Sequence, residues 1–175
     1  YRASYWTRIE RIYNCLRILG RYFKYNRRVV MKTRVNELRK ALELEQIDAL
    51  LVSNPENRRY LSGFSGSAGY LIISSNKSIL ATDFRYIEQA GRQSPDFEII
   101  RIGGNQSWLS EILKTQSVNR LGFESDNLTV AQYETILNSL KTNMPNDNIS
   151  LVGTSNVVEI LRSIKDADEM VALTK

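Results

Sequence analysis

The chain has 175 residues, of which 42% are hydrophobic and 25% are charged, a composition typical of one soluble globular domain. One cysteine excludes an internal disulfide, and the absence of histidine excludes Ser–His or Cys–His catalysis and a histidine-ligated metal site. The longest apolar run, residues 68–73, is too short for a transmembrane helix.

The net charge of +5 is unevenly distributed along the chain. Residues 1–30 carry eight Arg or Lys and one acidic residue, so residues 31–175 have a net charge of −2. Nucleic-acid binding requires a basic stripe on the folded body. The sequence therefore predicts no nucleic-acid partner.

Residues 1–30 are predicted to be a basic amphipathic leader, separate from a domain that starts at Met31. Apolar residues recur there every three or four positions, as on one face of a helix: Tyr5, Ile9, Ile12, Leu16, Leu19 and Phe23. This leader is either a helix that lies on a membrane or enters an organelle, or an upstream extension without a role in the domain. For the domain itself we expect no membrane partner.

Predicted elements alternate through the body. We expect helices at 33–46, 58–61, 84–93, 108–114, 129–141 and 156–161, and strands at 48–53, 69–74, 78–82, 97–102, 120–124 and 150–152. The alternation favours an α/β layered fold. The predicted hairpin 69–74/78–82 requires an antiparallel pair, so we expect a mixed sheet.

Four helix starts carry capping signals. Asn54 precedes a proline at the first helical position, and Asp83 is placed to cap the helix that begins at residue 84. Two pairs have capping-box spacing: Thr129 with Gln132, and Asn156 with Glu159.

Three glycines, Gly63, Gly66 and Gly69, lie between a predicted helix and a predicted strand. The segment has no lysine for a phosphate-binding loop, precedes a strand where a dinucleotide loop would follow one, and lacks the GxSxG of a nucleophile elbow. The remaining interpretation is a structural turn, in which glycine permits positive φ and close backbone approach.

Two motifs resemble the signatures of the N-terminal, creatinase/prolidase-type domain of Xaa-Pro peptidases in the pita-bread metallopeptidase family. They read Asn57-x-Arg59-Tyr60-Leu61-Ser62-Gly63-Phe64-x-Gly66-Ser67-x-Gly69 and Thr82-Asp83-Phe84-Arg85-Tyr86-Ile87-Glu88-Gln89-Ala90. The resemblance implies a three-layer α/β/α fold with a ribonuclease H-like motif at 31–162. Residues 163–175 then resemble the start of a linker to a catalytic domain.

This resemblance implies a non-catalytic domain that shapes the active-site entrance and the dimer interface of a cytoplasmic Xaa-Pro dipeptidase or aminopeptidase. The catalytic residues and two divalent metal ions (Mn, Co or Zn) would then lie in a C-terminal half beyond this chain, which alone would be inactive. The implied partners are that half, a second copy and proline-containing peptides. Two alternatives remain open: a pseudo-peptidase protein-binding module, and the N-terminal domain of a creatinase-type amidinohydrolase.

Three residues are candidates for facing a cleft or an interface: Phe64, Arg85 and Tyr86. Arg85 and Tyr86 follow a strand end, where an arginine could pair with a carboxylate. The alternative is that Phe64 and Tyr86 are core residues and that Arg85 pairs locally. No catalytic or metal-ligating residue is predicted in the chain.

Overall fold

The structure, a computed structural model, describes residues 27–103, 107–165 and 169–170. The predicted leader helix and most of the predicted linker lie outside these residues. Residues Met31–Ile164 form one compact unit, which contains both motifs. Within the described part of the chain, no helix has the length and hydropathy needed to cross a bilayer.

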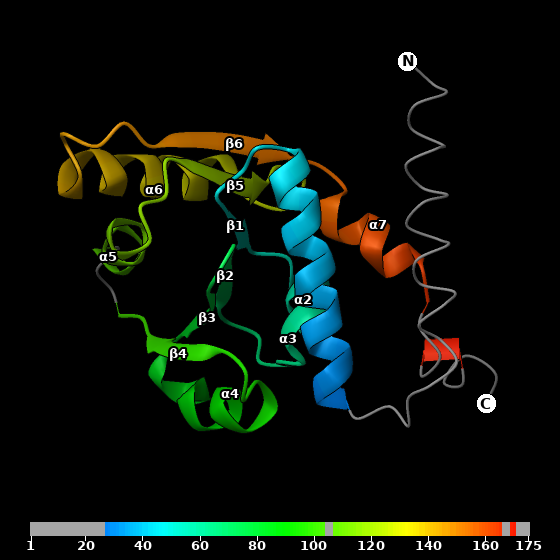
Figure 1. Ribbon diagram of the computed structural model, residues 1–175. Coiled ribbons are helices and arrows are strands. Elements are labelled where there is room, and N and C mark those ends of the chain that lie inside the picture. Colours follow the sequence, from blue (N-terminus) through cyan, green and yellow to red (C-terminus); the bar gives the residue numbers. More distant parts are fainter. Residues whose placement is uncertain (1–26, 104–106, 166–168, 171–175) are drawn as a thin grey trace, which may run out of the picture. The chain divides into compact units, whose positions relative to one another are not determined.

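A six-stranded sheet has the order β4-β3-β2-β1-β5-β6 (Figure 1). The strands are β1 (Ala49–Val52), β2 (Tyr70–Ser74), β3 (Ser78–Thr82), β4 (Glu98–Arg101), β5 (Arg120–Glu124) and β6 (Ser150–Thr154). β1, β2 and β3 pair antiparallel, whereas β1–β5, β3–β4 and β5–β6 are parallel. The predicted mixed sheet and its hairpin are confirmed.

The helices are α2 (Arg27–Leu44), α3 (Pro55–Ser62), the 3₁₀ turn η1 (Phe84–Tyr86), α4 (Ile87–Gln93), α5 (Ser107–Thr115), α6 (Val130–Asn143) and α7 (Val157–Ser163). α2 begins six residues before the predicted start at 33, because no proline or glycine interrupts the sequence there. The predicted helix 84–93 is divided into η1 and α4.

Two hydrophobic cores lie on opposite faces of the sheet, which confirms the three-layer α/β/α arrangement (Figure 1). One core includes side chains from α2, α3, α4 and α7, and the other includes side chains from α5 and α6. The central strand β1 is buried on both faces: Leu50 and Val52 belong to the first core, and Ala49 and Leu51 to the second.

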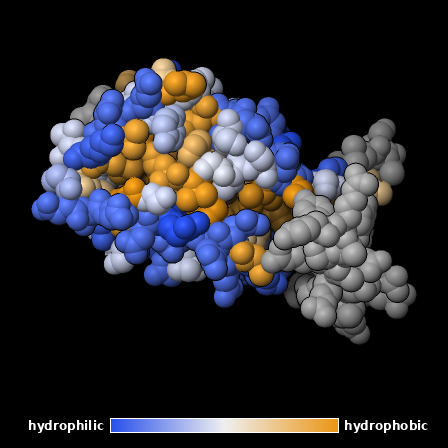
Figure 2. Space-filling model, turned by 90° about the horizontal axis from the view of Figure 1, so that it is seen from above, coloured by the Kyte–Doolittle hydropathy of each residue, from blue (hydrophilic) through white to orange (hydrophobic). Residues whose placement is uncertain are grey.

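The two edges of the sheet differ in side-chain chemistry. β4 carries exposed Glu98 and Arg101, whereas β6 has no charged residue, and its Leu151 and Val152 are half-buried. Figure 2, seen from the side on which β6 lies in Figure 1, shows apolar residues gathered on the surface. Charged side chains discourage strand addition at an edge, so only the β4 edge has this protection.

Three of the four predicted caps are present. Asn54 and Asp83 accept hydrogen bonds from backbone N–H groups of α3 and η1, and Thr129 forms a reciprocal capping box with Gln132. The box predicted for Asn156 and Glu159 is wrong. Asn156 has φ of 61° and makes no side-chain cap, while the Glu159 carboxylate accepts a hydrogen bond from Asn57 of α3.

Candidate functional site

The first motif begins with α3, whose two ends are both fixed by local sequence. Asn54 Oδ1 accepts hydrogen bonds from the N–H groups of Glu56 and Asn57 at 2.9 and 3.0 Å, and Pro55 occupies the first helical position. Gly63 ends the helix with φ of 76°, and its N–H donates to Arg59 O at 2.8 Å. This left-handed conformation is the usual glycine helix terminus. The chain therefore leaves α3 in a defined direction into the segment 63–69, here called the glycine loop.

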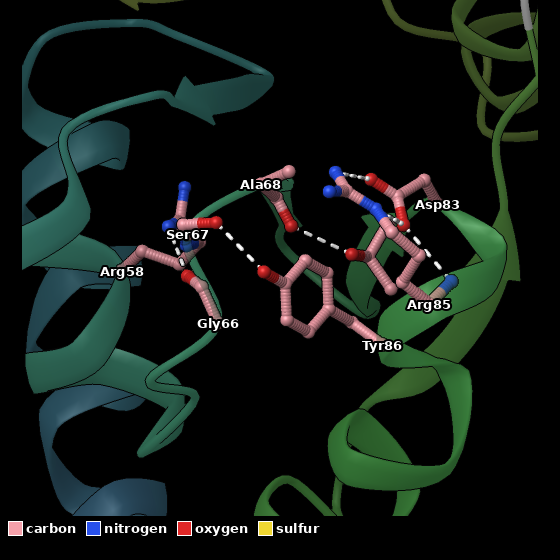
Figure 3. A network of polar contacts seen from close by, with 8 residues as sticks. Arg58, Gly66, Ser67, Ala68, Asp83, Arg85 and Tyr86 are labelled. Carbon is pink, nitrogen blue, oxygen red and sulfur yellow. Dashed lines mark hydrogen bonds and ion pairs between the residues drawn. The ribbon is translucent and has the colours of Figure 1, made fainter.

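Arg58 holds the glycine loop from inside. Its side chain donates to the carbonyl of Gly69 and, at 2.7 Å, to that of Gly66 (Figure 3). The residue is only 2% exposed, and this burial lowers the pKa of its guanidinium from 12.5. Two hydrogen bonds to loop carbonyls offset part of the cost of burying the charge. The loop is thus closed around a buried cation.

Phe64 fills the space that the loop glycines leave open. A Cβ at Gly66 would lie 2.3 Å from Phe64 Cζ, so only glycine fits beneath the ring. Gly69 has φ of +151°, and a Cβ there would lie 3.0 Å from Ala81 O. Phe64 itself is fully buried in the first core. The expectation that Phe64 faces a cleft is corrected: its ring is an anchor for the loop.

The second motif holds the same loop from the other side. Thr82 Oγ1 donates to Ala68 O at 2.6 Å, and the Tyr86 hydroxyl is hydrogen-bonded to Ser67 Oγ at 2.8 Å (Figure 3). The Tyr86 ring packs edge-on against Phe64, with 6.0 Å between the ring centroids. The two motifs therefore form one structural unit, and Tyr86 is a half-buried member of it.

Further hydrogen bonds from α4 secure the start of the loop. The Gln93 side-chain oxygen accepts from the N–H of Ser65 at 2.9 Å, and Gln89 Nε2 donates to Ser65 Oγ at 3.1 Å. Ser65 and Ser67, the two exposed serines of the loop, thus each bond to a side chain of the η1–α4 segment.

Asp83 and Arg85 form a local pair on the surface of this unit. Arg85 Nε and Nη2 donate to the two Asp83 carboxylate oxygens at 3.1 and 2.7 Å, and the Arg85 N–H donates to Asp83 Oδ1 at 2.9 Å (Figure 3). The hydrogen bond from the Arg85 side chain lowers the pKa of Asp83, and that contact raises the pKa of Arg85. The Arg85 side chain remains 57% exposed, so its outer face is open to a partner.

Phe84 is a surface feature that the sequence did not single out. It is 68% exposed, and the Arg101 guanidinium lies 5.8 Å from its ring centroid. Its position directly after the cap Asp83 was the available signal, because a first-turn residue need not face the core. Phe84 and Arg85 together form what we call the exposed pair.

The unit contains no evident chemistry of its own. Its serines bond to Gln89, Gln93 and Tyr86, with no histidine available as a base. Within residues 27–103, 107–165 and 169–170, no cluster of three or more potential ligand side chains is suited to hold a metal ion. What the arrangement can do is present an aromatic ring and a cation on a rigid support.

The creatinase/prolidase N-terminal domain family matches residues 34–164, three quarters of the chain. The chain belongs to this family. Both motifs of this creatinase/prolidase-type domain lie within the match, and together they build the unit around the glycine loop.

Relatives of the domain carry peptidase names. The chain is 37% identical to the uncharacterized peptidase YqhT of Bacillus subtilis over 125 residues, which are 71% of this chain and 34% of that protein. It is 29% identical to a probable Xaa-Pro aminopeptidase P of Penicillium rubens, covering 73% of this chain and 23% of that protein. The chain thus spans about a third or less of these relatives.

Solved structures show the same domain alone and within longer chains. An Xaa-Pro dipeptidase from Bacillus anthracis aligns with a TM-score of 0.73 and 32% identity, over 81% of this chain and 38% of that one. The N-terminal domain of the cytoplasmic peptidase PepQ from Mycobacterium tuberculosis aligns with a TM-score of 0.67 and 36% identity, over 74% of this chain and 98% of that one.

Proposed function

We propose that this chain is the non-catalytic N-terminal domain of a longer Xaa-Pro peptidase, either a dipeptidase or an aminopeptidase. Family membership and the Xaa-Pro names of several relatives support this. The matched relatives are roughly three or more times longer than their matched region, which leaves room for a catalytic half. Two divalent ions (Mn, Co or Zn) in that half would activate water and polarise the scissile carbonyl.

The observation that carries the proposal is the exposed pair on its rigid support. Phe84 is 68% exposed although the glycine loop and η1 around it are held by many internal bonds. An exposed aromatic ring beside a cation is costly to keep unless it meets a partner. We assign the exposed pair to the wall of the active-site entrance, where it would contact proline-containing peptides, the catalytic half or a second copy.

A homodimer in the cytoplasm completes the proposal. A wall contributed by one subunit to the entrance of another would explain an exposed pair with no role inside its own domain. The cytoplasmic placement rests on the similarity to PepQ, which is named as a cytoplasmic peptidase.

The test compares purified 1–175 with the chain extended to its natural C-terminus, in a proline-release assay with added Mn²⁺, Co²⁺ or Zn²⁺. We expect chelator-sensitive turnover only in the longer chain. Creatine hydrolysis by the longer chain would favour the amidinohydrolase alternative, and inactivity of both chains would favour the protein-binding module. Metal-dependent turnover by 1–175 would overturn the proposal.

A second measurement addresses the exposed pair in the longer chain. Phe84→Ala and Arg85→Gln should raise the KM for Xaa-Pro peptides several-fold and leave kcat within about twofold, because the pair contacts no reacting atom. Val130→Ala is the matched control, since Val130 is 75% exposed and lies on α6. An unchanged KM would remove the pair from the entrance.

A further inference from the structure

Asn57, the first residue of the first motif, is fully buried and faces away from the glycine loop. Its Nδ2 donates to Glu124 Oε1 on β5 at 2.7 Å and also to Glu159 Oε1 on α7. Its Oδ1 accepts from Arg162 Nη1, also on α7, at 2.8 Å. Both hydrogens of the amide are therefore used, and one side chain connects the sheet to two positions of α7.

Tyr60 contacts the other end of α7 from one turn further along α3. Its hydroxyl donates to Leu161 O at 3.1 Å. The last carbonyls of a helix have no partner within the helix, so Tyr60 completes the C-terminal end of α7. The Arg34 guanidinium lies 4.0 Å from the Tyr60 ring centroid and donates to Tyr60 O at 2.9 Å, which fixes the ring.

α7 depends on these contacts because it has little stability of its own. It has seven residues, and its N-cap Asn156 provides no side-chain hydrogen bond. Helices this short are not stable in isolation. Val158 is buried in the first core and Leu161 packs against it, which gives α7 an apolar face but does not set its rotation about that face.

α7 is also the last helix of the compact unit Met31–Ile164, so its direction determines where the chain leaves the domain. We infer that Asn57 and Tyr60 are positioning residues that fix this exit helix and thereby the placement of the polypeptide C-terminal to it. We call the contacts of Asn57 and Tyr60 with Glu159, Leu161 and Arg162 the exit clasp. For catalysis, this inference rests on the proposed function.

The local part of the inference is tested in 1–175 by amide hydrogen exchange. Tyr60→Phe and Arg162→Met each remove a hydrogen bond and keep the apolar part of the side chain. We expect exchange of the α7 amides to accelerate about fivefold per lost bond, with β1 and α6 unchanged. Tyr133→Phe and Arg92→Met are matched controls on α6 and α4. Unchanged α7 exchange would overturn the inference.

The positioning part is tested in the longer chain by two readouts. Cleavage after Glu169 by a glutamate-specific protease does not depend on activity, and the clasp variants should accelerate it several-fold. In Xaa-Pro hydrolysis, the same variants should raise KM several-fold with kcat nearly unchanged, and Arg162→Lys, which retains a donor, should restore most of the loss. Faster α7 exchange with unchanged cleavage would reduce the clasp to a local structural role and overturn positioning. A longer chain that is inactive even with native residues would refute the proposed function, while the cleavage result would still decide the inference.

Discussion

The two motifs differ in where they direct their polar groups. The glycine loop of the first motif turns its carbonyls inward, toward Arg58 and Thr82, and its central aromatic residue, Phe64, is fully buried. The start of the second motif turns outward: Asp83 and Arg85 satisfy each other on the surface, and Phe84 is 68% exposed. The difference indicates that the loop is the support and that the exposed pair is the part available to a partner. Substitutions in the loop should therefore affect stability, and substitutions in the exposed pair should not.

Gly66→Ala should have the largest effect. The new Cβ would overlap the Phe64 ring, so the free energy of unfolding should fall by about 2–3 kcal/mol in chemical denaturation. Gly91→Ala is the control, because a Cβ there meets nothing within 4 Å and alanine favours the helix. Combining Gly66→Ala with Phe64→Leu should recover part of the loss. Equal losses in the single and the double variant would show that the ring is not the obstacle.

Arg58→Met should rank next. It leaves the carbonyls of Gly66 and Gly69 without their buried donor, which should cost about 2 kcal/mol of unfolding free energy. Arg92→Met, at a position 73% exposed, should stay within about 0.5 kcal/mol of the native chain. Similar urea midpoints for the two variants would contradict the internal role of Arg58.

Tyr86→Phe should have a smaller effect. It removes the hydrogen bond to Ser67 but keeps the edge-on contact with Phe64, so we expect a loss of about 0.5–1 kcal/mol in thermal or chemical unfolding. Tyr133→Phe serves as the control for loss of a tyrosine hydroxyl, since its ring contact with Phe123 is retained. A neutral Tyr86→Phe would mean that packing alone joins the two motifs.

Arg85→Gln should have the smallest effect, and one confined to acid. Arg85 lowers the pKa of Asp83, so its stabilising contribution is present above the unfolded-state pKa of about 3.9 and is lost as pH falls through the lower folded-state pKa. The difference in melting temperature between native chain and variant should therefore be small at pH 6 and vanish near pH 2. Arg92→Gln should show no such convergence. A difference that grows toward acid would contradict the direction of the pKa shift.

Local signals made much of the fold predictable. β5 lies at the predicted residues, and Asn54, Asp83 and the Thr129–Gln132 box cap helices as expected, because each depends on residues within one turn. The two motifs identified the family. Long-range contacts were the part that sequence could not supply: Glu159 is spaced for a capping box, but its carboxylate is used by Asn57, 102 residues earlier in the chain.

The candidate site shows the same division. The sequence selected Phe64 and Arg85 from motif position, yet Phe64 is buried because Gly66 leaves space for its ring. Phe84 was not selected, since nothing in its local pattern shows that the residues after Asp83 turn away from the core. Exposure of a side chain in a motif is decided by tertiary packing, which spacing along the chain does not encode.

The position of β1 in the sheet has a consequence for synthesis of the chain. β2 can pair with one edge of β1 early, but Leu51 meets Phe123 of β5 on the other edge, 72 residues later in the chain. At roughly 5–20 residues per second of translation, that edge stays open for about 4–14 seconds. During this interval a fully apolar strand, ALLV, presents unpaired backbone to its surroundings. The nascent chain is therefore most vulnerable to aggregation and most attractive to chaperones before β5 emerges, and slowing translation between residues 52 and 120 should lower the soluble yield.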